Sequence, residues 1–238
     1  MERTSQAWMW PAEEPFPHPM GTEAKVWILG AGRFGRLAVE RLFKDERSTG
    51  VIVDADPHRL REAPKKDGWI AVRGDVFVFL SNQVLSDDQW IIPAVPIHVA
   101  LGWIVMELGK RGVVHRLPVP HDADSLVPHP IRTLSGTLYA SHAVFRCPDD
   151  CPEPEAFCTI TKKPRPEKLY RILQKLAIRD YAPVVIQSRQ LAPGVGGYTG
   201  GQLKEALAAI LQRPGSYIVA TSCSCHAVMD AVCWDGPF

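Results

Sequence analysis

Runs of apolar residues, separated by glycine, proline and acidic residues, predict an α/β fold for this chain. The run at 26–29 is followed by apolar positions at 34, 37, 38 and 42, a spacing typical of a helix packed on a sheet. Apolar runs at 51–54, 69–75 and 90–96 predict three further strands. A helix over 98–112 and a short strand at 113–117 would complete a doubly wound parallel sheet.

The second half repeats this alternation on a smaller scale. A helix that begins at Pro166 precedes a strand at 183–191, a glycine-rich loop at 194–201, a helix over 202–211 and a strand at 216–222. Strand, helix and strand in this order predict parallel strands that end at one edge of a sheet, which would place the glycine loop beside residues 223–226. The residues after His226 predict a helix, with Cys233 in its core-facing side.

Composition and charge argue against nucleic acid and membrane surfaces as partners of this chain. The chain is 46% hydrophobic and 22% charged, with a net charge of +1 and both signs interspersed, which gives no footprint for nucleic acid or for a membrane surface. The uncharged stretch 90–106 contains two prolines and is better explained by a buried strand and helix than by direct membrane insertion. The N-terminus lacks the pattern of a signal peptide, so we expect a cytoplasmic protein in which disulfides are rare.

The first predicted strand is followed by glycines at G-x-G-x-x-G spacing. Gly30 would allow the tight turn, Gly32 would let a pyrophosphate approach the backbone, and Gly35 would let helix and strand pack closely. The helix N-terminus would then offer N–H groups to the phosphates. Asp54 ends the second apolar run, 19 residues after Gly35, where a carboxylate accepts from the ribose hydroxyls and repels a 2′-phosphate. This pattern favours NAD(H) over NADP(H); the alternative is an acid that only caps a turn.

The segments "VWILGAGRFGRLAVERL", "VIVDADPHRL" and "VRGD" resemble the NAD-binding regulatory domain of the TrkA N-terminal, or RCK, family over about residues 24–110. The resemblance implies a Rossmann fold, with the glycine segment on the pyrophosphate, Asp54 on the adenine ribose, and Gly74 and Asp75 beside the adenine pocket. The predicted dinucleotide-binding residues are Gly30, Ala31, Gly32, Arg33, Phe34, Gly35, Asp54, Ala55, Gly74 and Asp75. The second half shows no typical regulatory domain of that family, and cysteine-rich sequence stands in its place.

The cysteines form two groups, "CPDDCPEPEAFC" at 147–158 and "SCSCH" at 222–226. Their spacing matches neither common zinc fingers nor ferredoxins, but the interleaved prolines and acids make a poor apolar core. A zinc or iron–sulfur site, ordinary free cysteines and a redox-active thiol pair all stay open. We expect the predicted helix to stabilise the thiolates of the second group. The candidate metal ligands are Cys147, Cys151, Cys158, Cys223, Cys225 and His226.

The sequence therefore predicts three segments: a loose N-terminal arm at 1–22, a Rossmann-like dinucleotide-binding domain at 23–135, and a Cys-rich α/β domain with a glycine-rich loop at 136–238. Three functions fit: an NAD(H)-binding redox protein with a thiolate metal site, an NAD(H) sensor of TrkA/RCK type with a structural metal, and a dehydrogenase with incidental cysteines. A homodimer or a protein partner is compatible with each. His98 stands where a dehydrogenase could hold a proton donor, but a histidine bonded to a backbone carbonyl is the commoner case, and no catalytic residue is assigned.

Overall fold

The computed structural model describes residues 25–42, 49–65 and 68–238, so the predicted N-terminal arm at 1–22 lies outside the described residues. Within these ranges the chain is a mixed α/β protein whose strands form two mixed sheets. The helices are α1 (Arg33–Leu42), α2 (Pro57–Glu62), α3 (Val76–Ser81), α4 (Val99–Gly109), α5 (Leu169–Gln174) and α6 (Gly200–Leu211), with a 3₁₀ helix η1 (His121–Ser125).

The first sheet contains the strands that the N-terminal apolar runs predict. Its order is β3 (Trp69–Arg73), β2 (Gly50–Asp54), β1 (Val26–Leu29), β4 (Trp90–Pro93), β10 (Val195–Thr199) and β9 (Arg189–Ala192). The first four strands are parallel, whereas β10 joins β4 antiparallel, with Tyr198 opposite Ile91. The first sheet is therefore completed by a hairpin from the second half of the chain.

The second sheet is mostly antiparallel. Its order is β6 (Ile131–Arg132), β7 (Leu138–Ser141), β12 (His226–Pro237), β11 (Gly215–Ser222) and β8 (Tyr181–Gln187), and β5 (Gly112–Leu117) also pairs with β12. The predicted parallel pairing of the strands at 183–191 and 216–222 is confirmed for β8 and β11, which pair over Ser216–Ser222 of β11. The end of the predicted strand at 183–191 instead forms β9 of the first sheet.

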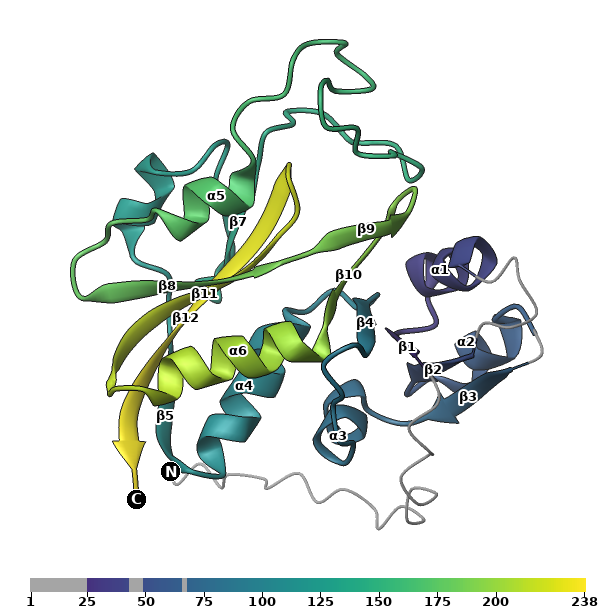
Figure 1. Cartoon of the computed structure of the whole chain (residues 1–238), viewed down its shortest axis with the longest axis horizontal. Coiled ribbons are helices and arrows are strands. Elements are labelled where there is room, and N and C mark those ends of the chain that lie inside the picture. Colours follow the sequence, from purple (N-terminus) through teal and green to yellow (C-terminus); the bar gives the residue numbers. More distant parts are fainter. Residues whose placement is uncertain (1–24, 43–48, 66–67) are drawn as a thin grey trace, which may run out of the picture.

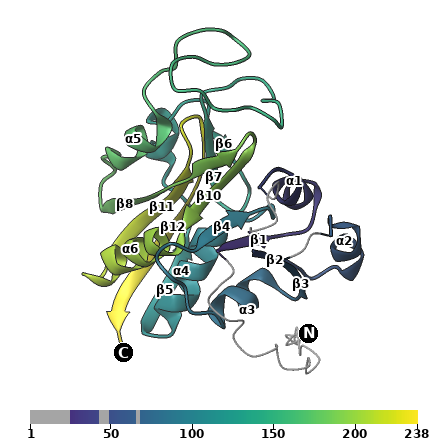
Figure 2. The same ribbon diagram turned by 45° about the vertical axis from the view of Figure 1, so that its right-hand side comes forward.

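Helices fill the space between the sheets and cover both outer faces. Residues of α3, α4 and α6 form one apolar core with the facing surfaces of both sheets (Figure 1). On β1, Trp27 and Leu29 point into this core, whereas Ile28 packs on the opposite face with residues of α1. Figure 2 shows α1 and α2 on that outer face. The outer face of the second sheet is covered by α5 and η1. Because both faces are buried, the central strands are almost continuously apolar.

One predicted element and one predicted sheet position are wrong. The residues after His226 form strand β12 and not a helix. The predicted strand at 113–117 is present as β5, but it joins the second sheet antiparallel to β12 instead of completing the first. The sheets therefore do not follow the predicted segment boundary at residue 135. Strand β5, which precedes it, lies in the second sheet, whereas β9 and β10, which follow it, lie in the first. The predicted helix from Pro166 is shorter than expected and spans Leu169–Gln174.

The apolar stretch 90–106 forms β4 and most of α4, as a buried strand and helix. In the part of the chain that the structure describes, no helix combines the length and the apolar character needed to cross a membrane.

Candidate functional site

Gly30, Ala31 and Gly32 form the loop that joins β1 to α1 at the carboxyl edge of the first sheet. This segment is called the glycine loop below. Gly30 has a φ of +110°, and a Cβ there would lie 2.7 Å from the Ala94 oxygen. A Cβ at Gly35 would lie 1.8 Å from the Gly30 oxygen, so helix and turn could not approach as they do. The fold itself therefore requires these two glycines.

Gly32 differs from the other two glycines of the motif. A Cβ built on it would have no atom of the described chain within 4 Å, and its φ lies outside the left-handed region. Its carbonyl accepts the first helical hydrogen bond of α1, from Arg36 N at 3.0 Å. The space above Gly32 is open at a helix N-terminus, where unpaired N–H groups and the helix dipole favour an anion.

Asp54 lies at the end of β2 and contacts the glycine loop directly. Its side chain is only 8% exposed; Oδ2 accepts from Ala31 N at 2.7 Å and Oδ1 accepts from Asp56 N at 2.8 Å. Each carboxylate oxygen has a second lone pair, so both can accept one more hydrogen bond. Arg59 Nη1 lies 3.9 Å from Oδ2. The Asp54 carboxylate therefore holds the backbone of the glycine loop and of the β2–α2 turn in place, and it is also a candidate acceptor for ribose hydroxyls.

The other predicted dinucleotide residues lie around this point. Ala55 follows Asp54, and Gly74 N donates to the Asp54 carbonyl at 3.0 Å. The carboxylate of Asp75 caps α3 by accepting from Phe77 N and Val78 N, at 2.8 and 3.1 Å. Phe34 is half exposed. The structure thus brings the predicted residues of β1, β2 and β3 to one edge of the sheet.

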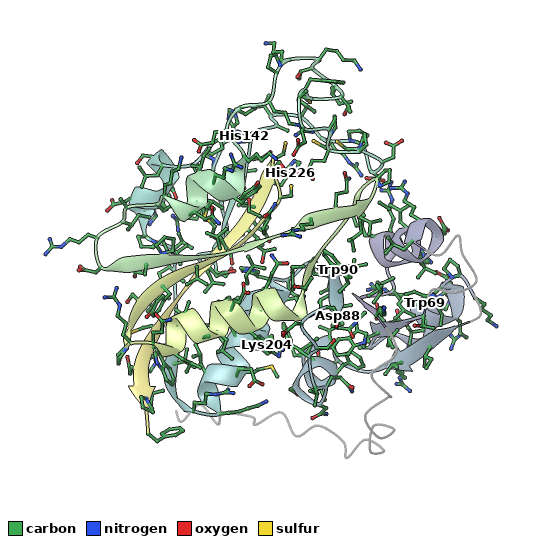
Figure 3. All side chains as sticks on the ribbon, in the orientation of Figure 1. Trp69, Asp88, Trp90, His142, Lys204 and His226 are labelled. Carbon is green, nitrogen blue, oxygen red and sulfur yellow. The ribbon has the colours of Figure 1, made fainter. Side chains whose placement is uncertain are left out.

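All six candidate metal ligands line one cavity, which we call the thiol cavity. It has a volume of about 480 Å³ and is bordered by the loop that carries Cys147, Cys151 and Cys158 and by the β11–β12 turn that carries Cys223, Cys225 and His226. His142 also lines it, and Figure 3 shows His142 near His226, with sulfur atoms gathered beside them. Residues about 75 positions apart in the chain are therefore neighbours in this cavity.

Direct contacts inside the thiol cavity involve both groups of cysteines. Cys147 Sγ lies 3.5 Å from His226 Nε2, and Cys223 Sγ lies 3.8 Å from His226 Nδ1. The backbone N–H groups of Cys225 and His226 both donate to Cys223 Sγ at 3.4 Å. Arg165 Nη1 donates to Cys225 Sγ. Within residues 25–42, 49–65 and 68–238, no group of three or more His, Cys, Asp or Glu side chains is already arranged to hold a metal ion.

The predicted helix dipole does not act on the second cysteine group, because Cys223 and Cys225 lie in the turn of a hairpin. Burial raises the pKa of Cys223 to about 12, with a further contribution from the negative charge of Glu153. Desolvation lowers the pKa of His226, so its imidazole is neutral at pH 7. Cys233 lies on β12 outside the cavity, partly exposed, where its thiol donates to Asp235 Oδ1 at 3.2 Å. Its predicted place in a helix core is wrong.

The thiols are expected to differ in reactivity, which alkylation can measure. Hydrogen bonds from the backbone N–H and the hydroxyl of Thr161 lower the pKa of Cys158, whereas burial raises that of Cys223. At pH 8 the Cys158 thiol should therefore be ionised to a greater extent, and the thiolate is the reactive form. In chelator-treated protein, we expect iodoacetamide to modify Cys158 at least about tenfold faster than Cys223, measured by peptide mass spectrometry. Equal rates would contradict these environments.

The predicted glycine loop at 194–201 is not a single loop. Residues 195–199 form β10, and Gly200 and Gly201 begin α6, capped by Thr199 and Gln202. Of the five glycines, Gly194 and Gly196 line the thiol cavity, as the shared-edge argument predicts. A Cβ at Gly194 would clash with the Asp149 carbonyl oxygen. Close packing therefore accounts for a glycine at this position, and a phosphate site is not needed to explain it.

An ion pair that the sequence does not reveal links the two sites. Arg33, in the first turn of α1, pairs with Asp149, which lies between Cys147 and Cys151. Arg41 of the same helix donates to the Asp149 carbonyl at 2.7 Å, and Gly194 N donates to the Cys151 carbonyl at 3.1 Å. The loop that carries three cysteines is therefore docked on the helix that follows the glycine motif.

His98 takes part in a second network that sequence reasoning missed. Its Nδ1 lies 2.9 Å from Asp230 Oδ2 and its Nε2 lies 2.9 Å from Thr221 Oγ1, so its partners are side chains and not a backbone carbonyl. Asp230 also accepts from the Thr137 hydroxyl at 2.6 Å. The only feature of the sequence that points to this network is Asp230, a charged residue among the apolar positions of β12.

Comparison with known proteins relates both halves of the chain to one archaeal protein. Residues 100–235 match the family AF_1314_C, described as "Uncharacterized protein, C-terminal domain". A protein of Archaeoglobus fulgidus, described as "Uncharacterized protein", is 27% identical over 222 residues, which cover 86% of this chain and 97% of that relative. No solved structure matches the chain significantly. Since the family match extends from α4 into β12 and covers more than half of the residues, the chain belongs to the AF_1314_C family.

Proposed function

We propose that this chain is a cytoplasmic NAD(H)-binding protein with a redox role. The parallel strand order β3-β2-β1-β4, with α1, α2 and α3 between successive strands, supports a Rossmann-like dinucleotide-binding fold. In such open sheets, ligands bind beyond the carboxyl ends of the strands. The glycine loop and Asp54 both lie at those ends.

The observation that carries the proposal is the meeting of Asp54 with the glycine loop. The hydrogen bond from Ala31 N to Asp54 Oδ2 holds the loop and the acid in one place. The open space over Gly32 would receive the pyrophosphate, and the free lone pairs of Asp54 would accept from the ribose. A carboxylate disfavours the 2′-phosphate of NADP(H), so NAD(H) is the preferred ligand.

The redox role rests on the position of the thiol cavity. Five cysteines line a cavity whose loop is docked on α1 through Arg33 and Asp149. Thiols and a nicotinamide cofactor are both redox-active groups, and this ion pair would connect the thiol cavity to a dinucleotide bound at α1.

The same ion pair favours a second candidate, an NAD(H) sensor of the TrkA/RCK type. A dinucleotide phosphate above Gly32 would attract the guanidinium of Arg33 and compete with Asp149 for it. Nucleotide occupancy would then change the docking of the cysteine loop without any hydride transfer. Turnover of NADH by the purified protein would distinguish the redox protein from the sensor.

Direct titration tests the binding itself. We expect NADH fluorescence to change and saturate when the protein is added, and NADPH to bind more weakly. If neither dinucleotide binds the folded chain, both candidate functions fail.

Replacing Asp54 by asparagine should reduce the preference for NADH. The amide removes the charge that repels a 2′-phosphate, and Arg59 is close enough to attract that phosphate. We expect NADH affinity to fall about tenfold and the NADH-over-NADPH preference to decrease with it. The variant should also be less stable by about 1–2 kcal/mol, because an amide has one acceptor oxygen for two backbone donors.

The matched control is Asp56→Asn. Asp56 caps α2 through Oδ1, which accepts from His58 N at 2.8 Å, and asparagine caps a helix equally well. This control should bind both dinucleotides as the parent does. Equal weakening of NADH and NADPH binding in Asp54→Asn would point to damaged folding and remove the ribose role.

A further inference from the structure

The thiol cavity combines the ligands that thiophilic metals prefer. Five thiols and the imidazole of His226 face it from two independent segments, the 147–158 loop and the β11–β12 turn. Thiolate sulfur and neutral imidazole are the usual protein ligands of zinc, and thiolates hold iron–sulfur clusters.

The contacts of His226 have the separation expected of two ligands of one ion. Zinc–sulfur and zinc–nitrogen bonds of about 2.3 and 2.1 Å at a tetrahedral angle place the sulfur and nitrogen about 3.6 Å apart. Cys147 Sγ and His226 Nε2 are 3.5 Å apart, and Cys223 Sγ and His226 Nδ1 are 3.8 Å apart. A histidine uses one ring nitrogen for one ion, so on metal binding one of these contacts would persist and the other sulfur would have to turn toward the ion.

Three hydrogen-bond donors already point at two of the thiols. Two backbone N–H groups already point at Cys223 Sγ, and Arg165 donates to Cys225 Sγ. Such donors stabilise a thiolate and offset the charge of a site with several of them. Glu153 Oε1 accepts from Ser224 N at 2.7 Å and so holds the turn next to the loop.

We propose that the thiol cavity is a thiolate metal centre, with ligands drawn from Cys147, Cys151, Cys158, Cys223, Cys225 and His226. Zinc is favoured by the ligand-like distances to His226, and an iron–sulfur cluster shares the same thiolate chemistry. The loop at 142–168 is largely irregular, with a single bridge between Phe157 and Pro164, so its thiols can turn inward when a metal binds. This proposal depends on residues different from those of the dinucleotide site and stands if NAD(H) binding fails.

The test is metal and acid-labile sulfide analysis of the full chain purified without air, followed by incubation with Zn²⁺, or with iron and sulfide, and removal of unbound ions. About one zinc per chain, or iron with an equal amount of sulfide and a brown colour, supports the centre and tells the two forms apart. A folded chain that retains neither after both incubations overturns the proposal.

Two variants locate the centre. Cys147→Ser should lose most of the bound metal, whereas Cys233→Ser, the matched control outside the cavity, should retain it. Equal retention by both variants would overturn the assignment.

Thiol protection in the unmodified chain covers the case in which Cys147→Ser fails to fold. With metal bound, the ligand cysteines should become alkylated at least tenfold more slowly than in chelator-treated protein, while Cys233 reacts at an unchanged rate. If metal leaves the rates of all cavity cysteines unchanged, the metal is not bound there.

Discussion

Replacing Gly32 by valine is expected to weaken NADH binding strongly while leaving the fold in place. The added side chain enters the open space at the N-terminus of α1, where the pyrophosphate would lie against the backbone. We expect a loss of affinity of about 100-fold or more, equivalent to about 2.7 kcal/mol. Because no atom of the described chain lies within 4 Å of the new Cβ, folding stability should fall by only about 1 kcal/mol, the loss of a good helix cap.

Gly109→Val provides the control for this substitution. A Cβ at Gly109 also meets no atom within 4 Å, but this residue ends α4, away from the carboxyl edge of the first sheet. NADH affinity, measured by fluorescence titration, should change less than about twofold in this variant. If Gly32→Val binds NADH as tightly as Gly109→Val does, the pyrophosphate does not lie on this loop.

Replacing Asp230 by alanine should be the most destabilising change at a polar position. Because a carboxylate only accepts, His98 Nδ1 and the Thr137 hydroxyl both donate to Asp230. The variant leaves two donors unpaired, one of them on a side chain that is only 4% exposed. Each unsatisfied group costs about 1–3 kcal/mol, so we expect a loss of about 3 kcal/mol in the free energy of unfolding, measured in urea.

Asp235→Ala offers a comparison on the same strand. Asp235 also contacts a histidine, His115, at 3.1 Å, but both side chains are about half exposed. Pairs of this kind contribute little, so we expect a change within about 0.5 kcal/mol. Similar losses in the two variants would show that the His98 network carries no special stability.

The parts of the fold that depend on local pattern could be predicted from the sequence. The β1–α1 unit, β2, and the pair formed by β4 and α4 follow from short apolar runs, glycine turns and helical spacing. The stripe from Leu169 to Leu176 packs against the second sheet as its periodicity indicates, although the helix itself is shorter than predicted.

The sequence after His226 resembles that of a helix for a physical reason. Ala227, Met229 and Ala231 pack on one face of β12, and Val232 and Trp234 pack on the other. With both faces buried, the alternation that marks a strand disappears, and the small and apolar residues resemble a helix. The two-sided burial of β12 depends on helices from distant parts of the chain.

The sequence allows the residues of the dinucleotide site and of the thiol cavity to be predicted, but not the contacts that join the two. The glycine spacing and Asp54 could be recognised, and the shared edge of β8 and β11 correctly placed Gly194 near the cysteines. The docking of Asp149 on Arg33 and the approach of Arg165 to Cys225 depend on how the irregular loop at 142–168 folds against α1 and against the β11–β12 turn. No local pattern encodes such contacts, because they join residues more than fifty positions apart.

The pairing of β10 with β4 has a consequence for folding of the chain during its synthesis on the ribosome. The edge of β4 stays unpaired until the hairpin that covers it has been made, roughly a hundred residues later, which is a delay of about 5–20 s at ordinary rates of synthesis. During that time the nascent chain exposes backbone groups that can capture another strand. We therefore expect the growing N-terminal half to depend on chaperones until β10 has been synthesised and has paired with β4.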